Sequence, residues 1–315
     1  HNFQDEVFGR TGTQAIYNAN VSGGSKDFKY NVSYAHNQEN SIMEKSGYNK
    51  DNIGAKLQAK LNKWLTFDFN ARMAYQKIKG LSGGADTNDS NAANSTVAQT
   101  ITFAPIQELV TSDEDEDNSA SSRRSPMERL DGTYKLQTRF QQNYNAALTW
   151  KPFKHWTAKT EFGYGWKYYD TDQAWTALAV NNSKFGHNGR PQAQFVRDTY
   201  KSWRNANTLT YDNNKLFGGR DHLNVLIGHE WSSDMQTTRT STSVDFPVDF
   251  TIDQILSFTN TAESTLGNEA DIKAKENMLS FFGRINYTLA DKYLMTFTLR
   301  EDGSSKFGKG NRWGL

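Results

Sequence analysis

The chain has 315 residues and a formal net charge of +1, from 36 basic and 35 acidic side chains, and it shows no basic stripe of the kind that binds nucleic acid. It has no cysteine, which excludes disulfides, thiolate metal sites and a cysteine nucleophile. Aromatic residues make up 13% of a chain whose mean hydropathy is only −0.79, a mixture expected of a β-barrel with a wet lumen and an aromatic outer face.

Alternation of polar and apolar residues predicts about ten β-strands. Successive side chains of a strand point to opposite faces, and from Leu65 to Gln76 every odd position is apolar while the even positions are mainly polar. In chain order, the predicted strands are 14–22, 28–37, 52–61, 65–76, 142–150, 156–168, 200–211, 222–240, 278–289 and 293–302. Most of these lengths suit a tilted strand that crosses a bilayer, which needs roughly 9–11 residues.

The connections between these strands alternate in length along the chain. The shorter ones are residues 23–27, 62–63, 152–154, 212–220 and 290–292. The longer ones are residues 40–50, 77–139, 169–194 and 241–275. Outer-membrane barrels have short periplasmic turns and long external loops. Soluble antiparallel sandwiches and jelly rolls also have alternating strands, but they have no reason to sort loop length in this way.

Aromatic residues gather at the two ends of the predicted strands. Six lie beside the short turns, namely Trp64, Trp150, Trp156, Tyr211, Tyr287 and Tyr293. Four lie toward the long loops, namely Tyr34, Tyr75, Trp166 and Tyr168. Two aromatic girdles at the two membrane interfaces produce this distribution. The predicted fold is therefore all-β, an antiparallel up-and-down meander that forms part of a transmembrane barrel.

The polar parity of the strands carries charged residues that are expected to line a lumen. They are Asp68, Arg72, Lys159, Glu161, Lys167, Arg284 and Arg300. A lumen of mixed charge needs polar walls, and each of these side chains is expected to bond to its neighbours, to a plug or to water.

No pattern in the sequence points to catalysis or to a metal site. There is no H-E-x-x-H motif and no phosphate-binding glycine loop, and His222 and His229 fall on opposite faces of one predicted strand. The acidic run Asp113–Asp117 could bind Ca²⁺, but a solvated loop tip is the favoured interpretation. Asp170 and Asp172 could be imagined as the acid and base of a glycosidase, which is disfavoured. The sequence predicts a protein that is not an enzyme and that has no cofactor.

Motifs near both ends of the chain resemble one family. Near the C-terminus the chain reads Gly283-Arg284-Ile285-Asn286-Tyr287, Asp291-Lys292-Tyr293-Leu294, Arg300-Glu301-Asp302-Gly303-Ser304-Ser305-Lys306-Phe307-Gly308 and Asn311-Arg312-Trp313-Gly314. Near the N-terminus it reads Phe8-Gly9-Arg10-Thr11-Gly12 and Val21-Ser22-Gly23-Gly24-Ser25. In this order and spacing the motifs resemble the SusC/RagA family of TonB-dependent transporters. Two positions depart mildly: Phe3 stands where the family often has Trp, and Lys306 where it usually has Arg.

The resemblance implies import of bulky nutrients, mostly oligosaccharides and sometimes peptides, across the bacterial outer membrane. It implies a SusD-like surface lipoprotein as lid, the outer-membrane lipid as surroundings, and TonB as the energy source, acting through an N-terminal region. Residues 1–315 are then expected to be part of a barrel domain of about 22 strands, with the plug, the TonB box and the C-terminal strands outside them.

Two other functions remain open at the level of sequence. A passive porin or a surface adhesin could use the same kind of barrel but lacks a plug. A secreted β-rich domain that binds or hydrolyses glycans would be a stable monomer without detergent.

Overall fold

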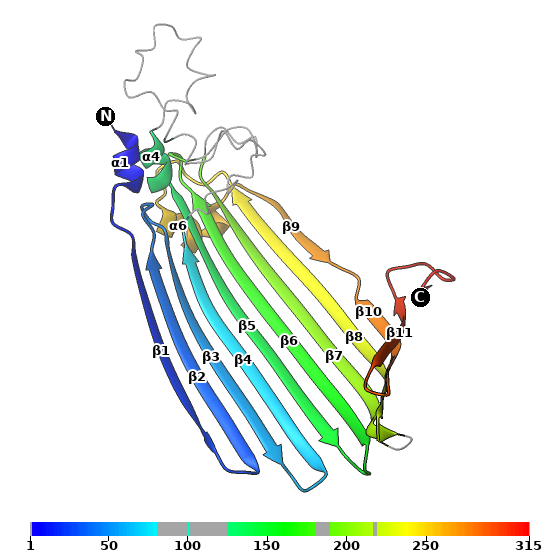
Figure 1. Ribbon diagram of the computed structural model, residues 1–315. Helices are drawn as coiled ribbons and strands as arrows, with labels where there is room; N and C mark the ends of the chain where they lie inside the picture. The colour runs from blue at the N-terminus through cyan, green and yellow to red at the C-terminus, as the bar shows by residue number, and fades with distance from the viewer. Residues whose placement is uncertain (1, 81–99, 101–124, 180–189, 217–218, 315) are drawn as a thin grey trace.

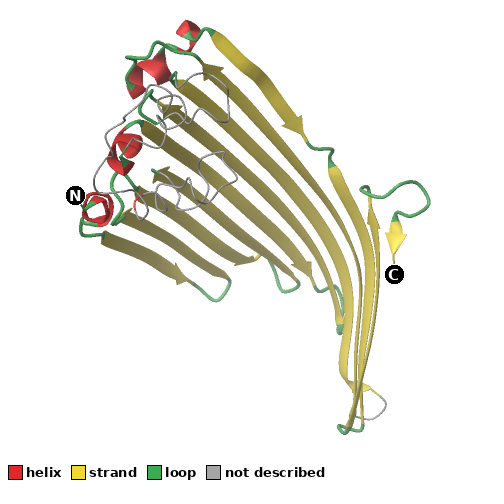
Figure 2. Cartoon of the chain, turned by 90° about the horizontal axis from the view of Figure 1, so that it is seen from above, coloured by secondary structure: helices red, strands yellow, loops and turns green. Residues whose placement is uncertain are grey.

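The computed structural model describes residues 2–80, 100, 125–179, 190–216 and 219–314. The strands in these residues form one twisted antiparallel sheet (Figure 1). Its strand order is β1-β2-β3-β4-β5-β6-β7-β8-β10-β11-β12, with β9 paired to β8. The first and last strands lie at opposite sides of the sheet, which is curved when seen from above (Figure 2). The predicted up-and-down meander is confirmed.

The strands are long and most follow one another directly. They are β1 (Thr13–Gly24), β2 (Phe28–Asn40), β3 (Gly47–Lys60), β4 (Leu65–Lys79), β5 (Thr133–Trp150), β6 (Trp156–Trp175), β7 (Gln192–Leu216), β8 (Asp221–Val244), β9 (Ser264–Ile272), β10 (Glu276–Leu289), β11 (Tyr293–Ser304) and β12 (Trp313–Gly314). The helices are α1 (Phe3–Phe8), α4 (Pro126–Asp131), α6 (Ile252–Ser257) and the 3₁₀ helix η3 (Thr259–Thr261). α1, α4 and α6 gather at one end of the sheet and the short turns at the other (Figure 1).

The strand register fixes which side chains share a face, because residues directly opposite in an antiparallel pair point to the same side. Phe69 is opposite Ala146, and Ala146 is opposite Phe162. The neighbouring row of the other parity joins Asp68, Ala147 and Glu161. The sheet therefore has an apolar face and a polar face, as the sequence predicts.

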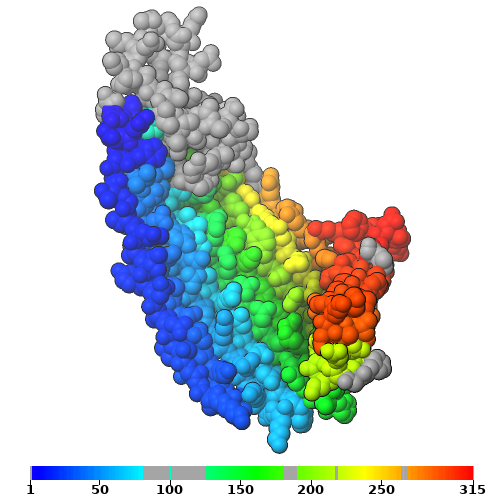
Figure 3. All heavy atoms as spheres, in the orientation of Figure 1, coloured from blue at the N-terminus to red at the C-terminus, as the bar shows by residue number. Residues whose placement is uncertain are grey.

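The apolar face is open rather than packed against a second layer. Phe297 is 63% exposed, Ile227 is 56% exposed and Trp231 is 50% exposed. The register places nine of the ten aromatic residues of the two predicted girdles on this face, and Trp64 lies in the turn just before β4. The space-filling view shows the strands side by side in one continuous wall between β1 and β11 (Figure 3). An apolar surface of this extent needs an apolar solvent. None of the helices in the described part of the chain has the length and apolar character needed to cross a bilayer.

Most predicted strand ends agree with the structure within a few residues, but the long-loop ends of β3, β5, β6 and β7 are wrong, because these strands extend further than predicted. β3 begins at Gly47, β5 at Thr133 and β7 at Gln192, so the predicted loops over residues 40–50, 77–139 and 169–194 are each partly strand. β9 lies inside the predicted loop 241–275, and β12 was not predicted. The strands continue past the bilayer, where water or loops cover both faces, and the alternation that lipid imposes is lost there.

Two small apolar clusters anchor the loop end of the sheet. Val7 of α1 packs with Met43 and Leu130, while Phe246 packs with Ile255 of α6. The helices α4 and α6 each begin with a capping box, formed by Ser125 with Glu128 and by Thr251 with Gln254. These short helices depend on tertiary packing, since isolated helices of this length are unstable in water.

An ion pair also ties two of the long connections together. The Arg190 guanidinium contacts both carboxylate oxygens of Glu263, at 2.7 and 2.8 Å. This contact holds the pKa of Glu263 below its ordinary value. A lowered carboxyl pKa stabilises the folded state above the ordinary glutamate pKa of about 4.3, and the stabilisation is lost as the pH falls through the lowered value.

We therefore expect the segment around Glu263 to loosen only under acidic conditions. The natural chain has no cysteine, so Thr265→Cys gives a single site for a nitroxide label. The mobility of this label is expected to rise as the pH falls below about 4. With Glu263→Gln the mobility is expected to be high at every pH. A titration that is unchanged by Glu263→Gln contradicts the assignment to this ion pair.

Candidate functional site

All seven charged residues predicted to line the lumen lie on the polar face of the sheet. The register relates them through their opposite partners, as when Arg72 faces Asn143 and Lys167 faces Tyr200. Arg284 is placed on the same face by its pairing with β8, and Arg300 by its pairing with β10. The sequence therefore identified the polar wall correctly, while the partners of each charge came only from the structure.

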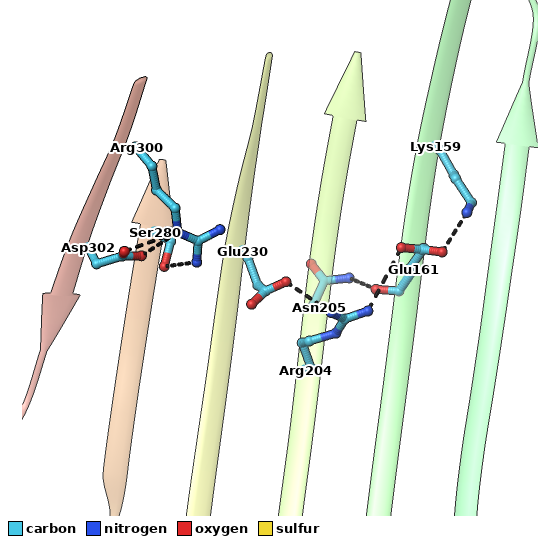
Figure 4. Close-up of polar contacts among 8 residues, drawn as sticks. All are labelled: Lys159, Glu161, Arg204, Asn205, Glu230, Ser280, Arg300 and Asp302. Atoms are coloured by element: carbon cyan, nitrogen blue, oxygen red, sulfur yellow. Dashed lines mark hydrogen bonds and ion pairs between the residues drawn. The ribbon is translucent and has the colours of Figure 1, made fainter. Parts of the chain in front are cut away.

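A ladder of alternating charges crosses β6, β7 and β8 on this face (Figure 4). Lys159 bonds to Glu161 on the same strand. Arg204 lies between two carboxylates, with Nη2 at 3.9 Å from Glu161 Oε2 and Nη1 at 3.1 Å from Glu230 Oε2. Asn205, from the next position on β7, donates to the Glu161 backbone oxygen at 3.0 Å. Each carboxylate of the ladder thus has a cationic neighbour.

A second polar group continues the ladder on β10 and β11 (Figure 4). Arg300 Nε lies 2.9 and 3.0 Å from the two carboxylate oxygens of Asp302, and Nη2 donates to Ser280 Oγ at 3.1 Å. Ser280 is opposite Glu230 in the register, so the two groups adjoin. The Arg300 guanidinium also lies 5.5 Å from the centre of the Phe282 ring.

The charges of this ladder balance, with Lys159, Arg204 and Arg300 against Glu161, Glu230 and Asp302. The arginines are about half exposed, at 50% for Arg204 and 45% for Arg300. Exposed ion pairs contribute little to stability, about 0–1 kcal/mol each. The ladder is better understood as a wetted binding surface, with donors and acceptors held in place, than as a stabilising element.

The ladder borders a hollow of about 460 Å³ on the polar face near the short turns. Its polar lining includes Lys29, Asn31, Lys56, Gln58, Asp68 and Asn145 in addition to Lys159, Glu161 and Arg204. Gln58 Nε2 donates to Asp68 Oδ1 at 2.8 Å, and the small side chain of Ala147 leaves the hollow open between the strands. A polar ligand or a polar protein segment can bind here, because the wall offers donors and acceptors in close array.

The structure also shows the surroundings of the other residues considered for chemistry. Asp170 and Asp172 both contact Arg197, and the Arg197–Asp172 distance is 3.0 Å. Both carboxylates are thus salt-bridged to one arginine, and they lie on the face opposite to the charge ladder. His222 and His229 are on opposite faces, as predicted, because they are an odd number of residues apart on β8. Among the described residues, no group of three His, Asp or Glu side chains is placed to hold a metal ion. The run Asp113–Asp117 lies outside the described residues.

Curated proteins with a similar sequence are TonB-dependent receptors. Receptor P39 from Formosa agariphila is 24% identical over 307 residues, which cover 96% of this chain and 27% of that protein. Receptor SusC from Bacteroides thetaiotaomicron is 23% identical over 327 residues, which cover 99% of this chain and 31% of that protein. No family model matches the chain. The chain spans less than a third of the length of these relatives.

Solved structures with the same fold include a peptide transporter and an outer-membrane receptor. The RagAB peptide transporter matches with a TM-score of 0.76 and 18% identity, covering 99% of this chain and 34% of that one. The ferripyoverdine receptor of the outer membrane of Pseudomonas aeruginosa matches with a TM-score of 0.56 and 14% identity, covering 93% of this chain and 36% of that one. The resemblance to SusC and RagA therefore extends along the whole chain, and the fold is that of an outer-membrane β-barrel wall.

Proposed function

We propose that this chain supplies part of the barrel wall of a TonB-dependent importer that carries oligosaccharides or peptides across the bacterial outer membrane. The observation that carries the proposal is the division of one long meander into an open apolar face and a hydrated, charge-balanced face. A wall of this kind separates lipid from a polar passage. The similarity to SusC and to the RagAB peptide transporter supports the same assignment.

The proposal includes the partners of such an importer. Residues 1–315 form part of the barrel domain of a longer receptor, and the plug and the segment that contacts TonB lie outside them. A SusD-like surface lipoprotein covers the end with the long loops. The hollow beside Asp68 and Glu161 lies near the short turns, and in this proposal it faces the plug inside the lumen. The chain acts by binding and guiding solute, not by catalysis.

Uptake measurements with the intact receptor test this function. A strain that carries the full-length gene is expected to accumulate its oligosaccharide or peptide, and the uptake is expected to stop when TonB is deleted. A matched strain without the receptor gene gives the background. Solute entry that persists without TonB contradicts energised import and favours a passive porin.

A further inference from the structure

A row of polar side chains crosses β5, β6, β7 and β8 on the polar face, toward the long loops. In the register, Gln141 is opposite Lys167, Lys167 is opposite Tyr200, and Tyr200 is opposite Gln236. The row ends at Lys273, whose backbone N–H donates to the Gln236 backbone oxygen at 3.1 Å. It is separate from the charge ladder, which lies nearer to the short turns.

Two tyrosines form the centre of this surface. The rings of Tyr169 and Tyr200 lie 5.6 Å apart at an angle of 53°. Gln141 Nε2 donates to the Tyr169 hydroxyl at 3.1 Å, and Gln236 Nε2 donates to the Tyr200 hydroxyl at 3.0 Å. The Lys273 ammonium donates to Gln236 Oε1 at 2.9 Å. The amides hold the hydroxyls in place, so the two rings have a fixed geometry before any solute arrives.

Tyr200, together with Lys167, Gln236 and Lys273 of the same row, borders a hollow of about 240 Å³. Gly165 is one of its lining residues and is buried, and a Cβ atom there would lie 2.6 Å from Ser202 Oγ, which also lines the hollow. A larger residue at Gly165 would therefore take up part of this hollow. The hollow is therefore a feature of the wall that depends on glycine at this position.

The position of the surface places it where an incoming solute first meets the wall. Tyr169 lies 13 residues beyond Trp156, the first residue of β6 at a short turn. At about 3.3 Å per residue and a tilt of about 40°, this is about 33 Å above the turns. The apolar band of such barrels is only about 25 Å tall, so the tyrosines are beyond it, on the side of the long loops.

Cationic groups outnumber carboxylates around the tyrosines. The Arg139 guanidinium lies 5.1 Å from the centre of the Tyr169 ring, Lys167 lies between Gln141 and Tyr200 in the row, and Lys273 lies at its end. Within the described part of the chain, these three have no carboxylate at ion-pair distance. Of the nearby carboxylates, Glu276 is paired with Lys306 at 2.8 Å and Asp198 accepts a hydrogen bond from Thr238. Asp234 is the remaining carboxylate at the hollow.

We propose that this surface, formed by Arg139, Gln141, Lys167, Tyr169, Tyr200, Gln236 and Lys273, binds an acidic saccharide unit, a sugar ring that carries a carboxylate or a sulfate. The tyrosine rings pack against the apolar face of the sugar ring. The amides bond to its hydroxyls, and the unneutralised cations make charge-assisted hydrogen bonds to its anionic group. The inference rests on the proposed function, because it assumes that the polar face lines the route of the solute.

An acidic peptide fits this surface less well than an acidic sugar. Extended peptides gain most of their recognition from main-chain hydrogen bonds to a free strand edge. The strands β5, β6, β7 and β8 are all paired on both sides, so they offer side chains alone.

The test is a calorimetric titration of the full-length receptor in detergent with three probes. These are trigalacturonate, the neutral sugar maltotriose and the acidic peptide triglutamate. Trigalacturonate is expected to bind at least about tenfold more tightly than either of the others at low salt, a factor typical of one charge-assisted hydrogen bond. The preference over maltotriose is expected to shrink as salt screens the cations. Equal affinity for the two sugars, or tighter binding of triglutamate, overturns the proposal.

Matched variants locate the site. Lys167→Ala is expected to lower the affinity for trigalacturonate about tenfold and to leave the affinity for maltotriose unchanged. Tyr169→Ala is expected to lower the affinity for both sugars. The controls are Lys77→Ala and Tyr168→Ala, which change the same residue types on the apolar face. Controls that weaken binding as much as Lys167→Ala and Tyr169→Ala overturn the assignment.

The titration is independent of TonB, so the two proposals fail separately. If trigalacturonate binds as expected but uptake persists without TonB, energised import is wrong and the binding site stands. If uptake requires TonB but trigalacturonate shows no preference, import stands and the acidic-sugar site is wrong.

Discussion

Replacing Ile285 with arginine is expected to destabilise the folded barrel by about 1–3 kcal/mol, since a guanidinium on the lipid face costs about 2–4 kcal/mol at the middle of the bilayer and about 0–1 kcal/mol near an interface. Ile285 lies on the apolar face of β10, 43% exposed and four residues from the strand end at Leu289. On that face the guanidinium meets hydrocarbon in place of water, and it has to bend toward an interface or draw water into the membrane.

The matched control is Asn286→Arg, one residue further along the same strand but on the polar face. The natural Arg284 already shows that this face accepts a guanidinium, and Asn286 has only a 3.0 Å hydrogen bond from Thr296 to lose. Urea unfolding of the full-length receptor in lipid vesicles measures both variants. A loss of stability that is equal for Ile285→Arg and Asn286→Arg contradicts the assignment of the faces.

Which residues of a strand face lipid and which face the polar side could be predicted from the sequence. Each face of the sheet meets one kind of surroundings, so apolar and polar residues alternate with a period of two. Leu65, Phe67 and Phe69 meet lipid and alternate with Thr66 and Asp68, and such a pattern is visible in the sequence without knowledge of the neighbours. The short turns were also predictable, because the two patterned segments around them end only a few residues apart.

Cross-strand partners could not be predicted, because they depend on register. Lys159 and Glu161 are two residues apart, so their shared face follows from the sequence alone. Arg204 belongs to the polar face of its own strand, β7. Its position between Glu161 and Glu230, however, depends on how three strands are aligned. A shift of one residue would move Arg204 to the other face. The tyrosine pair was missed for the same reason, since Tyr169 and Tyr200 come from the parts of β6 and β7 where alternation between lipid and lumen has ended.

The loop end of the sheet contains an apolar cluster that the sequence also failed to reveal, and it leads to the second prediction. Phe246 and Ile255 are fully buried against Ala174 and Ala193 of β6 and β7. These alanines have the parity of the lipid-facing residues below them, but they lie beyond the membrane. The apolar side of the strands therefore needs a protein cover at this height, and α6 with Phe246 provides it.

Phe246→Ala is expected to cost about 3–5 kcal/mol within this cluster, because a large buried ring is lost and its contacts to Ile255 with it. The described residues that pack in this cluster, such as Ala174 and Ala193, lie at the loop end of the strands, so the effect is expected to remain local. Hydrogen exchange of the full-length receptor is expected to accelerate about 100-fold or more in Ile252–Ser257, and to remain unchanged in residues 156–168. Phe258→Ala is the control, because Phe258 belongs to the same loop but is 50% exposed. Unchanged protection of α6 in Phe246→Ala contradicts this cover role, and equal acceleration in the strands contradicts its local character.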